Sequence, residues 1–211
     1  ADPSIVSWFS ASTPFWFAAI LAAANTTQVL LQFDETNQHI RHIPMQIFRG
    51  LKNIARAYAM PELRTIFVTS FFFNAGFGFF IAFFGLFLIN RFHFNEARIG
   101  NFFAWVGLCA IATQVFTTRR VAARFSEPQV LRVSLLGVSA VMFAYILAPS
   151  PLWLFLIAPI SSTFNGLSLA NMGGLLSRSA APQVQGEILG IGSSVAALAN
   201  SVPPMLGGFF A

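Results

Sequence analysis

The stretch TIFVTSFFFNAGFGFFIAFFGLFLIN at residues 65–90 decides the fold class, because it contains no Asp, Glu, Lys or Arg. A helix rises about 1.5 Å per residue, so about 20 apolar residues cross the roughly 30 Å hydrocarbon core of a bilayer. The stretch is therefore long enough to span a membrane as a helix. It lacks the strand-like alternation of polar and apolar residues that a membrane barrel requires.

The composition of the whole chain also indicates an integral membrane protein. Of its 211 residues, 56% are hydrophobic and 9% are charged, whereas soluble domains are about 25% charged. So few charges cannot cover the surface of a globular domain in water. The composition excludes a soluble enzyme, a disordered tail and a disulfide scaffold, and the single Cys109 gives no disulfide framework.

Five further apolar stretches bring the number of expected membrane spans to six. The uncharged run from Val133 to Ser177 is too long for one helix, and Pro149-Ser150-Pro151 divides it because residues before proline disfavour helical geometry. The expected spans are residues 12–33, 65–90, 99–118, 131–148, 152–176 and 188–211. The predicted fold class is an all-α membrane protein, a multi-span helical bundle.

The basic residues predict the orientation, since cytoplasmic connections carry an excess of Lys and Arg. All but two of the 12 Lys and Arg residues lie in one set of alternate connections, and the other set holds Arg91 and Arg98. The rich set includes the 34–63 connection, which we therefore expect on the cytoplasmic side of the plasma (inner) membrane. Ile47, Leu51 and Ile54 recur there at helical spacing, so we expect an amphipathic helix at the headgroups, the alternative being a solvated linker.

Uncharged polar side chains within the spans are candidates for lining a substrate cavity. Polar groups in a membrane are costly unless they face a partner or water, and plain hydrogen bonding between helices is the alternative. The cavity candidates are Asn74, Gln114, Asn165, Asn171 and Ser194. No spacing of His, Cys, Asp and Glu resembles a metal site, and no nucleophile–base pair or phosphate loop occurs, so we expect no metal, no cofactor and no enzymatic activity.

The last expected span contains an unusual run, Pro203-Pro204-Met205-Leu206-Gly207-Gly208. Proline removes a backbone donor and strains the preceding turn, while glycine permits close approach of a neighbour. We expect this run to form a gate that bends or packs closely near the outer end of the span. The alternative is a simple helix end before an extracellular turn.

Three stretches at the starts of expected spans form a recognisable set: Ser12-Thr13-Pro14-Phe15-Trp16, Ile99-Gly100-Asn101-Phe102-Phe103 and Gln185-Gly186-Glu187-Ile188-Leu189-Gly190. They resemble the starts of helices six, eight and eleven of the major facilitator superfamily of transporters. The resemblance is greatest to its drug:proton antiporter branch with the tetracycline-resistance-like carriers. The chain thus resembles helices six to eleven, in the second half of a two-bundle fold.

The resemblance implies a domain organisation and a set of gate residues. Residues 1–33 would be helix six, residues 34–63 a cytoplasmic linker between bundles, and residues 64–211 five spans of the C-terminal bundle. The partner would be an N-terminal bundle of the same protein. The glycine-rich antiporter motif of helix five has its repeat-related counterpart in helix eleven, which assigns a gate and helix-packing role to Gly190, Ala199, Pro203, Pro204, Gly207 and Gly208. The Arg119–Arg124 loop lacks the family's Asp and Gly, so a gating charge pair is unsupported there.

The resemblance implies a secondary transporter that works by alternating access, most similar to proton-coupled exporters. The Phe-rich spans and neutral polar groups favour a small amphipathic organic substrate over a phosphate or dicarboxylate. The expected partners are this substrate, protons and the lipid bilayer, with no nucleic acid. Uptake or facilitated diffusion of a neutral metabolite such as a sugar is one alternative. A transport-inactive membrane receptor or scaffold is another.

Overall fold

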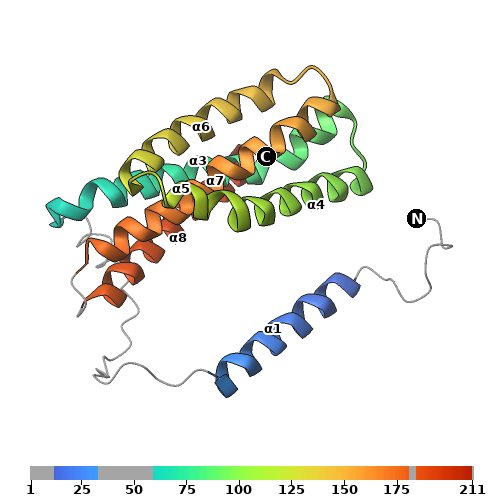
Figure 1. Cartoon of the computed structure of the whole chain (residues 1–211). Coiled ribbons are helices and arrows are strands. Elements are labelled where there is room, and N and C mark those ends of the chain that lie inside the picture. The colour runs from blue at the N-terminus through green and yellow to red at the C-terminus, as the bar shows by residue number, and fades with distance from the viewer. Residues whose placement is uncertain (1–11, 33–58, 181–183, 211) are drawn as a thin grey trace. The chain divides into compact units, whose positions relative to one another are not determined.

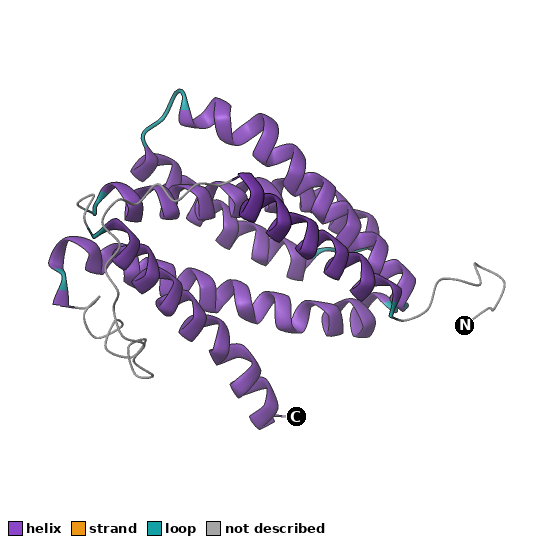
Figure 2. Cartoon of the chain, turned by 90° about the horizontal axis from the view of Figure 1, so that it is seen from below, coloured by secondary structure: helices purple, strands orange, loops and turns teal. Residues whose placement is uncertain are grey.

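The computed structural model describes residues 12–32, 59–180 and 184–210, and every regular element within these ranges is a helix (Figures 1 and 2). This confirms the all-α fold class. The elements are α1 (Thr13–Gln32), α3 (Pro61–Phe92), α4 (Glu96–Ala112), the π-helical turn η1 (Thr113–Thr118), α5 (Arg119–Ala122), α6 (Glu127–Leu147), α7 (Pro151–Arg178) and α8 (Gln185–Phe210). The expected amphipathic helix lies almost wholly within residues 33–58, outside the described ranges.

In the described ranges, 6 helices are long and apolar enough to cross a membrane, with α4, η1 and α5 forming one continuous helix. Each overlaps one of the spans expected from the sequence. Pro151 is the first residue of α7, so the Pro-Ser-Pro run separates two helices as expected. Proline suits that position because the first helical residue needs no backbone N–H partner.

Helix α1 belongs to a unit separate from the bundle formed by α3 to α8. Its apolar side chains are exposed along the whole helix, including Trp16 at 69% and Leu31 at 79%. A helix this apolar on all sides is typical of a membrane span, because hydrocarbon solvates such side chains and water does not.

Two helix pairs dominate the packing of the bundle: α6 runs against α7, and α3 runs against α8 (Figure 1). An aromatic core at the α3–α4 end surrounds Phe84 and includes Phe102, Tyr145 and Leu154. A second core at the opposite end joins α3 to α8 through Phe67 and Ile191. Helix α3 therefore packs against other helices at both ends of the bundle.

Glycine permits the closest approach in both helix pairs. A Cβ atom on Gly137 of α6 would lie 2.5 Å from the Phe164 ring of α7. A Cβ atom on Gly78 of α3 would lie 3.1 Å from Cγ of Pro203 and 3.3 Å from Oδ1 of Asn200, both on α8. Membrane helices associate largely through such close packing at small residues, so Gly78 and Gly137 are principal contact points.

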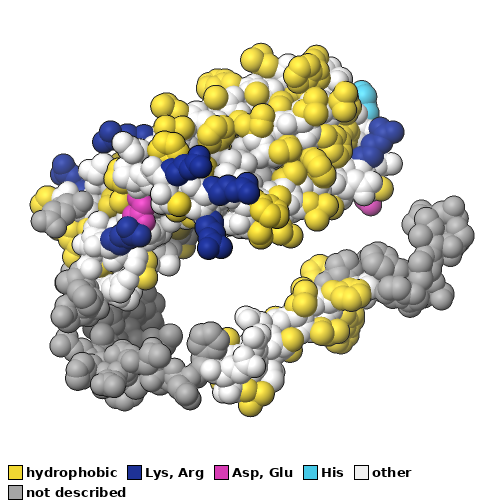
Figure 3. All heavy atoms as spheres, viewed as in Figure 1, with side chains coloured by type: hydrophobic (Ala, Val, Ile, Leu, Met, Phe, Trp, Pro, Cys, Tyr) yellow, Lys and Arg dark blue, Asp and Glu magenta, His cyan; other side chains and the backbone are white. Residues whose placement is uncertain are grey.

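The surface of the bundle separates apolar and charged side chains. Figure 3 shows hydrophobic side chains over much of one face and basic side chains gathered toward the end at α5. Leu136 at 73% and Phe143 at 67% exposure belong to the apolar surface. At the α5 end, Arg178 of α7 pairs with Glu127 of α6 at 3.2 Å. At the other end, Arg91 donates to the Ala148 carbonyl oxygen at 3.3 Å. This distribution fits a bundle embedded in a bilayer.

A proline inside α7 creates a bond between α7 and α4. Pro159 has no N–H group, so the carbonyl of Phe155, four residues earlier, loses its usual helical donor. The indole Nε1 of Trp105 on α4 donates to that carbonyl oxygen at 3.0 Å. The indole of Trp105 thus replaces the missing backbone hydrogen bond.

We expect Trp105→Phe to destabilise the protein by about 1–3 kcal/mol, because it leaves the Phe155 carbonyl without a donor. Pro159→Ala restores the backbone N–H, so Trp105→Phe in that background should cost less than about 1 kcal/mol. Thermal unfolding of the purified single and double variants measures this coupling. Equal costs of Trp105→Phe in the two backgrounds would show that the indole bond contributes nothing to stability.

Candidate functional site

A cavity of about 200 Å³ lies among α3, α4, η1, α6 and α7. One wall is aromatic and is formed by α3 and α4, with Phe80, Phe84 and Phe103 among its residues. The polar side chains of the lining come from η1, α6 and α7, and we call this space the amide cavity. Its lining residues are Phe77, Phe80, Ile81, Phe84, Phe102, Phe103, Val106, Ala110, Gln114, Tyr145, Ser161, Ser162, Asn165, Gly166 and Leu169.

The fold brings together two of the five predicted cavity residues, Gln114 of η1 and Asn165 of α7. Thr118 donates its hydroxyl to Oε1 of Gln114 at 3.1 Å. The Nδ2 atom of Asn165 is buried and has no hydrogen-bond partner among the described residues. A buried donor left unpaired costs about 1–3 kcal/mol, so the amide of Asn165 is ready to bond to a group that enters the cavity.

The π-helical turn η1 sets the position of Gln114. The carbonyl oxygen of Thr113, five residues earlier, lies 3.3 Å from the Thr118 hydroxyl, which shares its one hydrogen between this oxygen and Oε1 of Gln114. The hydroxyl oxygens of Thr113 and Thr163 lie 3.2 Å apart, and Thr163 donates to the Pro159 carbonyl oxygen at 2.8 Å. Thr113 must therefore donate to Thr163, which ties the turn to α7. Such π turns occur frequently at functional sites.

The other three predicted cavity residues do not line the amide cavity. Asn74 donates to the Ser70 carbonyl oxygen at 2.7 Å, and Asn171 donates to the Leu167 carbonyl oxygen at 2.7 Å. Ser194 donates to the Gly190 carbonyl oxygen at 3.0 Å. Each of these bonds stays within the residue's own helix.

The predicted gate residues fall on two faces of α8. Ala199 and Pro203 are buried, and Gly207 approaches Phe83 of α3, where a Cβ atom would lie 2.8 Å from Cζ. Gly190 and Pro204 are exposed, with no atom near a Cβ added to Gly190. Gly208 has a helical backbone.

Helix α8 does not end at its two prolines but continues to Phe210. Pro203 and Pro204 lack the N–H groups that would bond to the carbonyls of Ala199 and Asn200 in a regular helix. The helix is thus weakened within its length at the place where it packs on Gly78. Both prolines therefore lie within α8 and not beyond its last residue.

Several residues of the site were not identified from the sequence. The aromatic wall, Tyr145, and the two serines Ser161 and Ser162 were missed, as was Gly78 opposite Pro203. Phe is so frequent in the spans that no position stood out, and single Ser and Gly residues carry little signal. Gly78 follows Gly76 within the Phe-rich stretch, but nothing in the sequence identifies α8 as its partner.

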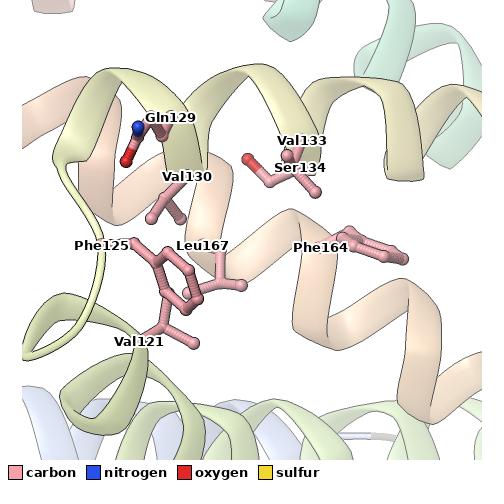
Figure 4. Close-up of a pocket in the computed structure, with 8 residues that line it drawn as sticks. All are labelled: Val121, Phe125, Gln129, Val130, Val133, Ser134, Phe164 and Leu167. Atoms are coloured by element: carbon pink, nitrogen blue, oxygen red, sulfur yellow. The ribbon is translucent and has the colours of Figure 1, made fainter.

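A second cavity of about 230 Å³ lies nearer the α5 end, between α6 and α7 (Figure 4). Val130 of α6 and Leu167 of α7 line it together with Phe125 from the preceding turn. Beside it, Ser168 donates to Ser134 at 2.9 Å in the buried α6–α7 contact. This cavity contains none of the predicted site residues, and its lining is almost entirely apolar.

Comparison with known proteins identifies the family. The Major Facilitator Superfamily model matches residues 2–211. Over 159 residues the chain is 26% identical to Solute carrier family 67 member A1 of Homo sapiens, covering 75% of this chain and 37% of that protein. It is 24% identical over 159 residues to Solute carrier family 22 member 18 of Mus musculus, covering 75% and 39%. The match thus spans less than two fifths of the length of these relatives.

Proposed function

Because the chain belongs to the major facilitator superfamily, a family of membrane transporters and not of enzymes, we propose that it functions in a secondary transporter. This transporter exports small amphipathic organic molecules by alternating access and is driven by protons. The observation that supports the substrate class is the lining of the amide cavity, which combines an aromatic wall with uncharged polar groups.

The chemistry of this lining favours a neutral or weakly polar solute. None of the residues that line the amide cavity carries a charge. A phosphate or dicarboxylate would lose its hydration on entry and find no Arg or Lys to compensate. Aromatic rings offer large apolar contact areas to a flat organic molecule. A sugar, with many hydroxyl groups, would leave most of its hydrogen bonds unmade against this wall.

The proposal of proton coupling rests on the resemblance to drug:proton antiporters. In the sequence, the acidic residues within or beside the five spans from α3 to α8 occur only near helix starts, at Glu62, Glu96, Glu127 and Glu187. Proton relays in membranes use a buried carboxylate or histidine. We therefore place the coupling group in the N-terminal bundle that we propose as the partner of this chain.

The proposed gate is the crossing of α3 and α8 at Gly78 and Pro203. Alternating access needs an element that packs closely in one state and yields in another. A Cβ atom added to Gly78 would lie 3.1 Å from Cγ of Pro203. At this same place α8 lacks two backbone hydrogen bonds, because Pro203 and Pro204 have no N–H group. The crossing lies near the middle of α3. We place the Arg-rich α5 end and the 34–63 connection in the cytoplasm, so that the run from Pro204 to Gly208 leads from the crossing toward the outer side of the plasma membrane.

Efflux of a fluorescent dye from cells expressing the full-length gene product tests the proposed function. Cells loaded with Nile red, a neutral amphipathic dye, should lose it faster than control cells, and a protonophore should abolish the difference. Gln114→Leu should slow the efflux, whereas Ser139→Ala on the exposed side of α6 should not. Dye movement that ignores the proton gradient would favour facilitated diffusion, and no movement would favour a receptor or scaffold.

A further inference from the structure

The polar side chains that line the amide cavity differ in whether the protein already satisfies them. Ser162 donates to the Val106 carbonyl oxygen at 3.3 Å. Tyr145 and Ser161 also line the cavity with their hydroxyl groups. Gln114 accepts from Thr118 through its amide oxygen. Among the described residues, only Asn165 has a buried side-chain nitrogen without a partner.

An unpaired amide nitrogen requires a hydrogen-bond acceptor, not another donor. The Asn165 side chain belongs to α7, whose preceding turn is fixed by the bonds of Ser162 and Thr163. A ligand that fills the cavity and presents an oxygen or nitrogen lone pair would satisfy it.

The rest of the cavity limits which acceptor can enter. Phe80, Phe84 and Phe103 present ring surfaces to the same space, and ring surfaces pack well against other flat apolar groups. A carboxylate or phosphate would supply an acceptor but would also bring an uncompensated charge into an uncharged site. The volume of about 200 Å³ is below the roughly 300–1,000 Å³ of pockets for drug-sized ligands.

We propose that the amide cavity selects neutral aromatic molecules that carry a carbonyl-type acceptor, and that Asn165 is the specificity-determining donor. The acceptor bonds to the Asn165 amide while the ring of the ligand packs on the Phe wall. A site built to donate a hydrogen bond discriminates strongly against an analogue that lacks the acceptor, because the buried donor is then left unpaired. The proposal deepens the proposed function by naming the class of substrate.

Equilibrium binding of two matched probes to the purified full-length protein in lipid nanodiscs tests this selection. Coumarin carries a lactone carbonyl on a flat bicyclic frame, and 1,2-dihydronaphthalene has a similar frame without an acceptor. Empty nanodiscs measure partition into lipid, which is subtracted for each probe. We expect the wild-type protein to bind coumarin about tenfold more tightly, which corresponds to about 1.4 kcal/mol.

Two asparagine variants identify the donor. Asn165→Leu removes the amide with little change in size, and it should abolish the preference for coumarin while binding of dihydronaphthalene is kept. Asn74→Leu makes the same change at an amide that is bonded within its own helix and lies outside the cavity, so the preference should persist. Both variants are compared at equal folded amounts, measured by size-exclusion chromatography.

Three results would overturn the inference. They are equal affinities of the wild-type protein for the two probes, a preference that survives Asn165→Leu, and no saturable binding of coumarin. Equal affinities would indicate that water satisfies the Asn165 donor. These outcomes leave the proposed function intact if gradient-driven dye efflux is still observed. Selective binding of coumarin without any dye efflux would instead contradict the proposed transport function, and the proposal for Asn165 would stand.

Discussion

Replacing Gly137 with alanine is expected to destabilise the bundle by about 1–3 kcal/mol, the usual cost of overpacking a core. The added Cβ atom would lie 2.5 Å from two atoms of the Phe164 ring, a distance that carbon atoms do not tolerate. Phe164 packs against the aromatic core and also lines the cavity between α6 and α7. To relieve the clash, either the ring must leave its place against that core or the α6–α7 pair, one of the two most extensive helix contacts, must separate locally.

Gly107→Ala is the matched control for this prediction. Gly107 lies in α4, and a Cβ atom there would meet nothing within 4 Å. Alanine is the better helix former, so this variant should be as stable as the wild type or slightly more so. Thermal unfolding in detergent compares the two, and Phe164→Leu should partly rescue Gly137→Ala. Equal stability of the two alanine variants would contradict the close contact between α6 and α7.

The second large effect is expected at the gate, from Gly78→Leu. A Cβ atom at Gly78 already lies 3.1 Å from Pro203, and the rest of a leucine side chain has no space between α3 and α8. We expect transport to slow by roughly tenfold, because a strain of about 1.4 kcal/mol in one state changes a rate by that factor. Substrate affinity should stay nearly unchanged, since neither Gly78 nor Pro203 lines the amide cavity, and transport rates are compared at equal amounts of folded protein in the membrane.

Gly76→Leu provides the comparison on the same helix, because a Cβ atom at Gly76 meets nothing within 4 Å. Its transport rate should equal that of the wild type. Gly207→Leu should have an intermediate effect, since the atom it meets is the tip of the Phe83 ring, which is 41% exposed and can turn aside. If the Gly78→Leu variant transports substrate at the wild-type rate, the α3–α8 crossing does not gate the carrier.

The spans could be predicted from the sequence because their signals are local. A charge-free run such as 65–90 is stable in a membrane and not in water. Pro151 favours a helix start whatever the helix later packs against. Helix ends differ from the expected boundaries by a few residues, because polar and charged residues such as Glu96 and Glu127 extend the helices beyond the apolar core.

The cavity could be predicted only in part, because a polar residue has two ways to be satisfied in a membrane. Gln114 and Asn165 face a shared space, whereas Asn74 and Asn171 bond to a carbonyl four residues earlier in their own helix. Both arrangements look identical in the sequence. The choice between them depends on which face of each helix meets a neighbour, and that is decided by packing between distant segments.

The π-helical turn at Thr113–Thr118 also determines the angular phase of the helix that follows it. Each residue of an α-helix rotates the chain by about 100°, so one extra residue in a turn rotates everything beyond it by about that angle. The directions of the Arg119 and Arg120 side chains around the helix axis are therefore set by the same turn that holds Gln114 beside the cavity. If the turn changed to a regular α-helix, the two arginines would rotate about the helix axis by about 100°, and Gln114 would move away from the cavity. The register of this one turn therefore sets both the position of Gln114 and the direction of the two arginines.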